Sequence, residues 1–195
     1  MTLSKRLTLA VLCMAVIFCT LTSVRAVAGQ NAAGGFSAAS PLSDRAWDWF
    51  AEQFGDCSSL PQLLHTVNRF AIENFTYEEQ KYFLVQTFYP DAFLFGEPFV
   101  GMCYEFACFT KSAVLVWAAE QGVEDIRCFV YSLKIGEDSY HAVNFICQGE
   151  DIYYIDVTTN NTQADRGESG NRILKLKCSI DEFIEKCEWE LESVH

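Results

Sequence analysis

The chain has 195 residues, of which half are hydrophobic and 14% aromatic, so a single domain with a sizeable core is expected. The net charge is −12, and it is −15 without the first 28 residues, which hold three of the 14 basic residues and no acidic one (11 basic against 26 acidic). Such a surface repels phosphate backbones and anionic lipid headgroups, which argues against nucleic acid as a partner.

Residues 1–28 have the pattern of a secretory signal peptide. Lys5 and Arg6 precede the apolar run LTLAVLCMAVIFCTL, and the small-residue pattern Ala26-Val27-Ala28 follows it. This order predicts export and cleavage after Ala28. An uncleaved membrane anchor is the alternative, but the run is slightly short for a bilayer span and contains threonine and cysteine. After cleavage we expect a secreted protein with no integral membrane domain.

A flexible leader and two helices are predicted next. Residues 29–42 are small and polar, which is typical of a leader, so the folded domain is expected over residues 43–195. Apolar residues at helical spacing predict helices over 44–54 and 60–74. Pro61 suits the first turn of the second helix. The apolar stripes of both helices are expected to be core.

The middle of the chain is strongly apolar. Residues 81–100 are interrupted by Pro90, Gly96 and Pro98, and we expect them to be core rather than a cover over a cleft. A long apolar helix is predicted over 102–121, with Gly122 ending it.

The second half of the chain has β periodicity. Runs rich in β-branched and aromatic residues, separated by the turn sequences GEDS and QGED, predict strands over 126–133, 141–147, 152–157 and 173–177. Ser179 and Glu182 form a capping box at the start of a last helix. This order predicts an α+β fold, in which N-terminal helices and one buried helix pack on an antiparallel sheet.

Seven of the nine cysteines remain after signal cleavage: Cys57, Cys103, Cys108, Cys128, Cys147, Cys178 and Cys187. An oxidising compartment favours disulfides, and an odd number leaves at least one thiol unpaired. We expect as many as three disulfides and an unpaired Cys103.

The most favoured disulfide joins Cys128 and Cys147, which lie near facing positions of adjacent predicted strands. Cys178 and Cys187 lie too far apart along one helix to pair with each other. With no C-x-x-C motif and three histidines, the sequence indicates no zinc site, and it indicates no other metal and no cofactor.

The stretch GMCYEFACF, residues 101–109, places Cys103 at the start of the buried helix. A helix N-terminus favours a thiolate, and a cysteine nucleophile needs a base. Of the three histidines, His195 ends the chain and His65 lies inside a helix. His141 opens a strand and is therefore the candidate base.

The hairpin register supplies a third group. If the QGED turn places Cys147 opposite Ile152, Asp156 lies opposite Val143, and His141 is its diagonal neighbour on the same face. Side chains can bridge the roughly 7–8 Å between such positions, whereas a turn one residue longer or shorter would separate the two onto opposite faces. We expect this shared face to pack on the helix of Cys103.

Three stretches, GMCYEFA, YHAVNFI and DIYYIDVTTN, resemble the three motifs of the transglutaminase-like superfamily, a branch of the papain-like fold. The matching residues are Gly101, Cys103, Ala107, His141, Ala142, Tyr153, Tyr154 and Asp156. The chain differs at Val143, where an aromatic residue is common, and at Val157, where proline is common. The likeness covers about residues 59–160.

The resemblance implies a catalytic triad of Cys103, His141 and Asp156. Cys103 would attack an amide carbonyl, His141 would protonate the departing amine, and Asp156 would orient the imidazole. The backbone N–H of Cys103 would help to form an oxyanion hole. Glu105 resembles an acidic residue often found there, or it complements the helix dipole.

The predicted function is that of an exported thiol enzyme that transfers the acyl group of a protein or peptide substrate to water or to an amine. Hydrolysis is slightly favoured because a small domain has little surface to hold two protein substrates. One alternative is a secreted binding or wall-associated module with a vestigial triad. Another is a structural domain in which Cys103 forms a disulfide. The sequence leaves the substrate and the oligomeric state open.

Overall fold

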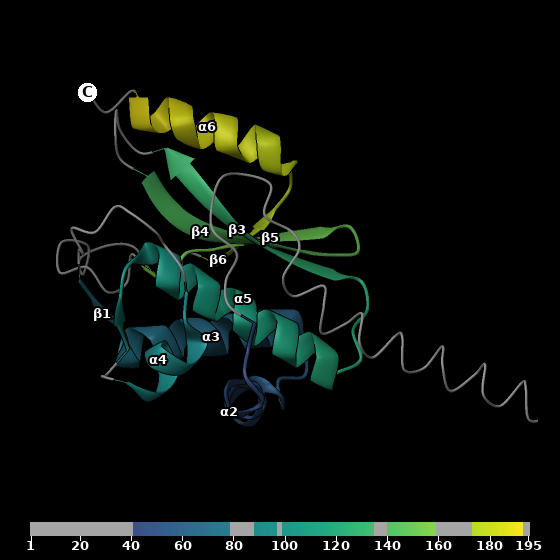
Figure 1. The fold of residues 1–195 in the computed structure, drawn as a ribbon. Helices are drawn as coiled ribbons and strands as arrows, with labels where there is room; N and C mark the ends of the chain where they lie inside the picture. Colours follow the sequence, from purple (N-terminus) through teal and green to yellow (C-terminus); the bar gives the residue numbers. More distant parts are fainter. Residues whose placement is uncertain (1–40, 79–87, 97–98, 135–139, 159–172, 193–195) are drawn as a thin grey trace, which may run out of the picture.

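The computed structural model describes residues 41–78, 88–96, 99–134, 140–158 and 173–192, with side chains only up to residue 186 in the last range. The predicted signal peptide and nearly all of the leader lie outside them. Figure 1 shows the elements α2 (Asp44–Phe54), α3 (Leu60–Asn74), β1 (Thr76–Tyr77), α4 (Pro90–Phe95), β2 (Val100–Gly101), α5 (Cys103–Glu120), β3 (Ile126–Lys134), β4 (Tyr140–Gln148), β5 (Asp151–Ile155), β6 (Ile173–Leu176) and α6 (Ile180–Glu192).

The helices predicted over 44–54 and 60–74 have these bounds in the structure, and the one predicted over 102–121 is α5, whereas α4 was not predicted. The Ser43 hydroxyl accepts a hydrogen bond from the Ala46 N–H at the start of α2, and Ser59 does the same for α3. After α5, Gly122 adopts a positive φ of 66°. The Val123 N–H then bonds back to the Ala118 carbonyl at 2.8 Å, which is the Schellman pattern of a helix end.

Four strands form an antiparallel sheet in the order β3-β4-β5-β6. The hairpin between β4 and β5 turns at Gly149, whose φ of 58° suits a two-residue hairpin loop. Cys147 lies opposite Ile152, so the predicted register of this hairpin is confirmed.

The molecule has an α+β fold, as predicted. In Figure 1, α5 crosses one face of the sheet and α6 crosses the other, and α2 and α3 lie beyond α5. Most side chains of α5 are buried, because the helix lies between the sheet and the N-terminal helices. The start of α5 is thereby held inside the domain rather than on its surface.

An aromatic cluster joins α5 to the N-terminal helices. Phe109 is fully buried and its ring packs against the rings of Trp49, Phe50, Phe54, Phe70, Phe75 and Phe93. Phe88, Phe93 and Leu94 are also buried, so part of the described stretch within residues 81–100 is core, as predicted, whereas Tyr89 is 61% exposed. This packing fixes the first half of α5 relative to α3 and α4.

The prediction that the sheet face carrying Val143 packs on α5 is wrong. Val143, Phe145 and Tyr154 pack in a second, smaller core with Ile184 of α6. The face that meets α5 carries Ala142 and Ile146 instead, together with residues of β5. Both faces are apolar because both are covered by a helix, so hydrophobicity alone did not separate them.

The predicted disulfide between Cys128 and Cys147 is also wrong. Cys128 lies opposite Ile146, whereas Cys147 lies opposite Arg127. A shift of one position puts the two side chains on opposite faces of the sheet, where they cannot meet. Among the described side chains all six cysteines are free thiols: Cys57, Cys103, Cys108, Cys128, Cys147 and Cys178.

Candidate active site

Cys103 is the first residue of α5 and is 8% exposed. Met102 precedes it in an extended conformation, with φ −105° and ψ 178°, so the chain enters the helix at the cysteine itself. The first N–H groups of an α-helix have no partner within the helix and carry its positive dipole end. Negative charge on the sulfur, or on an oxygen held beside it, is stabilised there.

Gly101 and Glu105 shape the entry to α5. A β-carbon on Gly101 would lie 3.0 Å from Cβ of Glu105 and 3.3 Å from the rings of Phe93 and Phe106, so only glycine fits without displacing them. The Glu105 carboxylate accepts a hydrogen bond of 3.0 Å from the Met102 N–H. Glu105 therefore caps the helix that presents Cys103.

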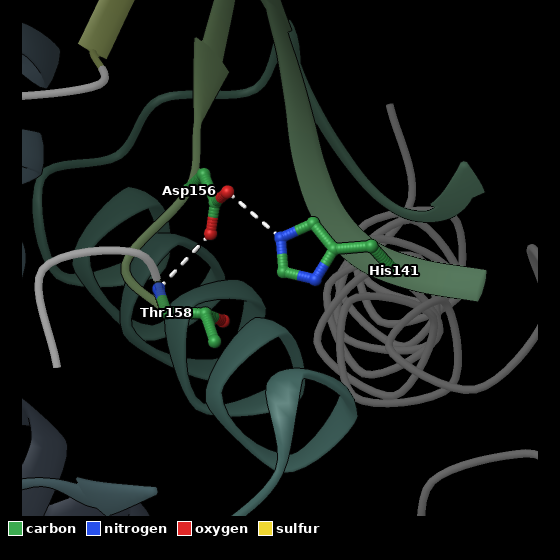
Figure 2. A network of polar contacts seen from close by, with 3 residues as sticks. All are labelled: His141, Asp156 and Thr158. Carbon is green, nitrogen blue, oxygen red and sulfur yellow. Dashed lines mark hydrogen bonds and ion pairs between the residues drawn. The ribbon is translucent and has the colours of Figure 1, made fainter. Parts of the chain in front are cut away.

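His141 and Asp156 meet at the end of the β4–β5 pair (Figure 2). The His141 Nε2 lies 2.8 Å from the Asp156 Oδ2, and the side chains are 19% and 1% exposed. The other carboxylate oxygen, Oδ1, accepts a hydrogen bond of 3.0 Å from the Thr158 backbone N–H. Asp156 is thus held at both oxygens and in turn holds the imidazole.

The imidazole also interacts with Cys103. Burial is the largest single influence on His141 and lowers its pKa, because it disfavours the charged ring. Hydrogen bonds to Asp156 and Cys103, together with their negative charges, outweigh burial and raise the pKa to about 10. Since Asp156 occupies Nε2, Nδ1 is the ring nitrogen left for the thiol. The three predicted site residues are therefore brought together.

Two other buried thiols have a different environment. Burial raises the pKa of Cys108 to about 12, and it raises that of Cys128 to about 12 as well. Such thiols stay protonated at neutral pH and are poor nucleophiles. Cys103, in contrast to these two thiols, interacts with His141.

The structure adds two groups that the sequence did not indicate. One is the Thr158 amide on Asp156, for which the Asp-Val-Thr stretch offered only a weak turn signal. The other is Asn144, a buried asparagine on β4 whose side chain reaches α5. An asparagine within an otherwise apolar strand was the available signal for this contact. His65 is exposed on α3, and His195 lies outside the described residues.

Within the described residues, no three histidine, cysteine, aspartate or glutamate side chains are grouped so as to hold a metal ion. No helix in that part of the chain has both the length and the hydrophobicity to cross a membrane.

Comparison with known proteins leaves the family open. No protein-family model matches the chain, and no curated protein matches it. A solved structure that it resembles is a "putative cysteine protease" from Cytophaga hutchinsonii, with 14% sequence identity and a TM-score of 0.44. The match covers 70% of this chain and 53% of the other, so the chain spans about half the length of that neighbour. At this level the likeness carries no argument about activity.

Proposed function

We propose that this protein is a cysteine hydrolase of the transglutaminase-like superfamily, with Cys103 as nucleophile, His141 as acid and base, and Asp156 as the group that orients the imidazole. The observation that carries the proposal is the position of His141, which bonds Asp156 at 2.8 Å and also interacts with the thiol at the start of α5. A nucleophile, a base and an orienting group in this order are what thiol catalysis requires.

In the acylation step the Cys103 sulfur attacks the carbonyl carbon of an amide, and the carbonyl π electrons move to its oxygen. The backbone N–H of Cys103 stabilises that oxyanion, because it lies at the positive end of α5. When the C–N bond breaks, the His141 imidazolium gives its Nδ1 proton to the departing amine. The products of this step are a thioester on Cys103 and a free amine.

In the second step neutral His141 removes a proton from water, and the resulting oxygen nucleophile attacks the thioester. The C–S bond breaks, a carboxylic acid leaves, and the proton returns to the thiolate–imidazole pair. An amine in place of water would give a new amide by the same route. We favour water, since the small domain has little surface to hold a second protein.

We also propose that the protein acts outside the cell that makes it. The basic start, the apolar run and the Ala26-Val27-Ala28 pattern support export with cleavage after Ala28. N-terminal sequencing of the full chain after expression in a secretory host tests this. A mature protein that starts at Gly29 is expected, and an intact N-terminus in a membrane fraction would contradict it.

The enzymatic proposal is tested by incubating the mature protein with a mixture of glutamine- and lysine-containing peptides and recording its intact mass. We expect an acyl adduct on Cys103, trapped by acid quenching, and carboxylic acid products. The matched control is Cys147→Ala, which removes a half-exposed thiol on β4 and should leave the adduct unchanged.

The outcomes of this experiment distinguish hydrolysis from transamidation and from a binding module. New amides formed with an added primary amine would replace hydrolysis by transamidation. Absence of an adduct, together with slow labelling of Cys103 by an electrophilic thiol probe, would contradict an enzyme and indicate a binding module.

A further inference from the structure

Asn144 is 1% exposed and uses its side-chain amide to join three elements of the fold. Its Nδ2 donates to the backbone carbonyl of Ala107 in α5 at 2.9 Å and to that of Phe129 in β3 at 3.3 Å. The same nitrogen lies 3.8 Å from the Cys128 sulfur. The amide therefore crosses the interface between α5 and the sheet.

The two ends of this contact lie close in sequence to the two reacting groups. Ala107 is one helical turn after Cys103, so both residues lie on the same side of α5. Asn144 lies three residues after His141 on β4, a separation of roughly 10 Å along the strand. The Asn144–Ala107 hydrogen bond is thus a direct polar link between the helix that carries the thiol and the strand that carries the imidazole.

Apart from the contact of His141 with Cys103, the described side chains of β4 that meet α5 do not restrict sliding in the same way. The side chains of Ala142, Ile146 and their neighbours that meet α5 are apolar, and apolar contacts are non-directional. A hydrogen bond loses strength steeply when its angle or length changes. Asn144 therefore sets the position of α5 along and around its axis relative to β4, where apolar packing alone would tolerate small shifts.

We propose that Asn144 is a positioning residue for the thiol–imidazole pair. It acts through Ala107 and the strand backbone, and it touches neither Cys103 nor the substrate. The proposal rests on the proposed function, because it assigns a role within the same Cys103–His141 pair. A leucine of similar size would preserve burial and lose the donor, so burial and positioning can be separated by substitution.

The test is the pH dependence of the alkylation of Cys103 by iodoacetamide, measured by peptide mass on the folded full chain. We expect Asn144→Leu to raise the pH of half-maximal alkylation by about one unit, which is about a tenfold loss of rate on the acidic side of the profile, well below the midpoint. The matched control is Thr110→Val. Thr110 is fully buried in α5 and its hydroxyl bonds the Phe106 carbonyl at 3.0 Å, within the same helix.

Thr110→Val should lower the thermal midpoint and leave the pH profile unchanged. If the leucine variant fails to fold, Asn144→Ala replaces it, because it leaves a cavity instead of a steric clash. A wild-type profile in an Asn144 variant, with a fast reaction still present near pH 6, would overturn the positioning role and leave the proposed function standing. A wild-type protein with no fast reaction near pH 6 would overturn both, since no activated pair would exist to be positioned.

Discussion

The Nε2 of His141 lies 2.8 Å from the Oδ2 of Asp156, although β5 ends one residue before that aspartate. The bond therefore lies just beyond the paired part of the β4–β5 hairpin. Because the Thr158 amide holds the second carboxylate oxygen at 3.0 Å, the aspartate cannot rotate without losing a buried hydrogen bond. The consequence is a fixed ring orientation, with Nε2 bound and Nδ1 left for Cys103.

Asp156→Asn is expected to lower the turnover number by about ten-thousandfold, the order known for a triad aspartate. The side-chain oxygen of the introduced asparagine can still accept a hydrogen bond from the Thr158 N–H. The side-chain nitrogen of the asparagine then points at the Nε2 of His141. That nitrogen donates, which places the imidazole proton on Nδ1 and removes the base that the thiol needs. Steady-state hydrolysis of a responsive peptide measures the loss.

Asp151→Asn is the matched control for this substitution. Asp151 begins β5 and forms an exposed ion pair of 2.6 Å with Lys175, the kind of contact worth about 0–1 kcal/mol. Turnover should not change in this variant. Equal losses at both aspartates would mean that the Asp156 effect is one of general stability.

Cys103→Ala is expected to abolish turnover, on the order of a millionfold, and His141→Ala should be nearly as severe. Both side chains lie at the ends of elements that apolar packing already holds, so the far-ultraviolet circular dichroism should be unchanged. Cys147→Ala should retain full turnover. A Cys103→Ala variant with wild-type activity is incompatible with the assigned nucleophile.

The raised pKa of His141 makes a prediction about pH. A group whose pKa rises to about 10 keeps its proton in the folded protein at pH values below about 10. The imidazolium is therefore present beside Cys103 also at the pH values below about 8.5 at which an ordinary thiol is uncharged. Alkylation of Cys103 should stay fast near pH 6, fall at more acidic values, and follow no simple thiol titration.

The alkaline side of the profile should depend on Asp156. Its hydrogen bond and charge raise the pKa of His141, so Asp156→Asn should make turnover decline at a lower pH than in the wild type. An unchanged alkaline limb would show that the carboxylate does not stabilise the imidazolium.

Buried thiols should behave differently from Cys103. Burial raises the pKa of Cys108 and Cys128 to about 12, so both should react with iodoacetamide only after unfolding. Mass mapping of the native protein at about pH 7, before and after denaturant, measures this. Labelling of Cys108 or Cys128 in the native state at the rate of Cys103 would contradict the arrangement.

Local signals predicted the helices and the hairpin well. Pro61, Gly122 and the Ser179–Glu182 capping box act within one turn of their own positions, so their meaning does not depend on the rest of the fold. The hairpin register was predicted on the condition that the QGED turn places Cys147 opposite Ile152, and the two-residue loop meets that condition. That register was sufficient to place His141 near Asp156.

Tertiary relations were harder to predict. Val143 and Ile146 point to opposite faces, and each face is buried by a different helix, so the sequence offers no polar face to exclude. The position of Cys128 opposite Ile146 depends on where β3 enters the sheet, which no local residue determines. The contact of Asn144 with Ala107 joins residues 37 positions apart and depends on both.

Gly101→Ala is expected to lower stability and thiol reactivity together. The added β-carbon would lie 3.0 Å from Cβ of Glu105 and 3.3 Å from ring carbons of Phe93 and Phe106, and each of these atoms is held by surrounding packing. Overpacking of this kind costs about 1–3 kcal/mol. Relieving this overpacking requires the start of α5 to move, and Cys103 lies two residues after Gly101. Thermal unfolding and alkylation of Cys103 near pH 6 measure the two effects.

Gly122→Ala tests whether a loss of stability alone changes the alkylation of Cys103. Gly122 lies beyond the other end of α5, with no atom within 4 Å of an added β-carbon, but its φ of 66° disfavours alanine by about 1–2 kcal/mol. This variant should therefore unfold at a lower temperature and alkylate Cys103 at the wild-type rate. If both glycine variants lost stability and neither changed alkylation, the close packing at Gly101 would serve the fold alone. A slower reaction in Gly101→Ala only would show that the packing of Phe93 and Phe106 against this glycine determines where the thiol lies.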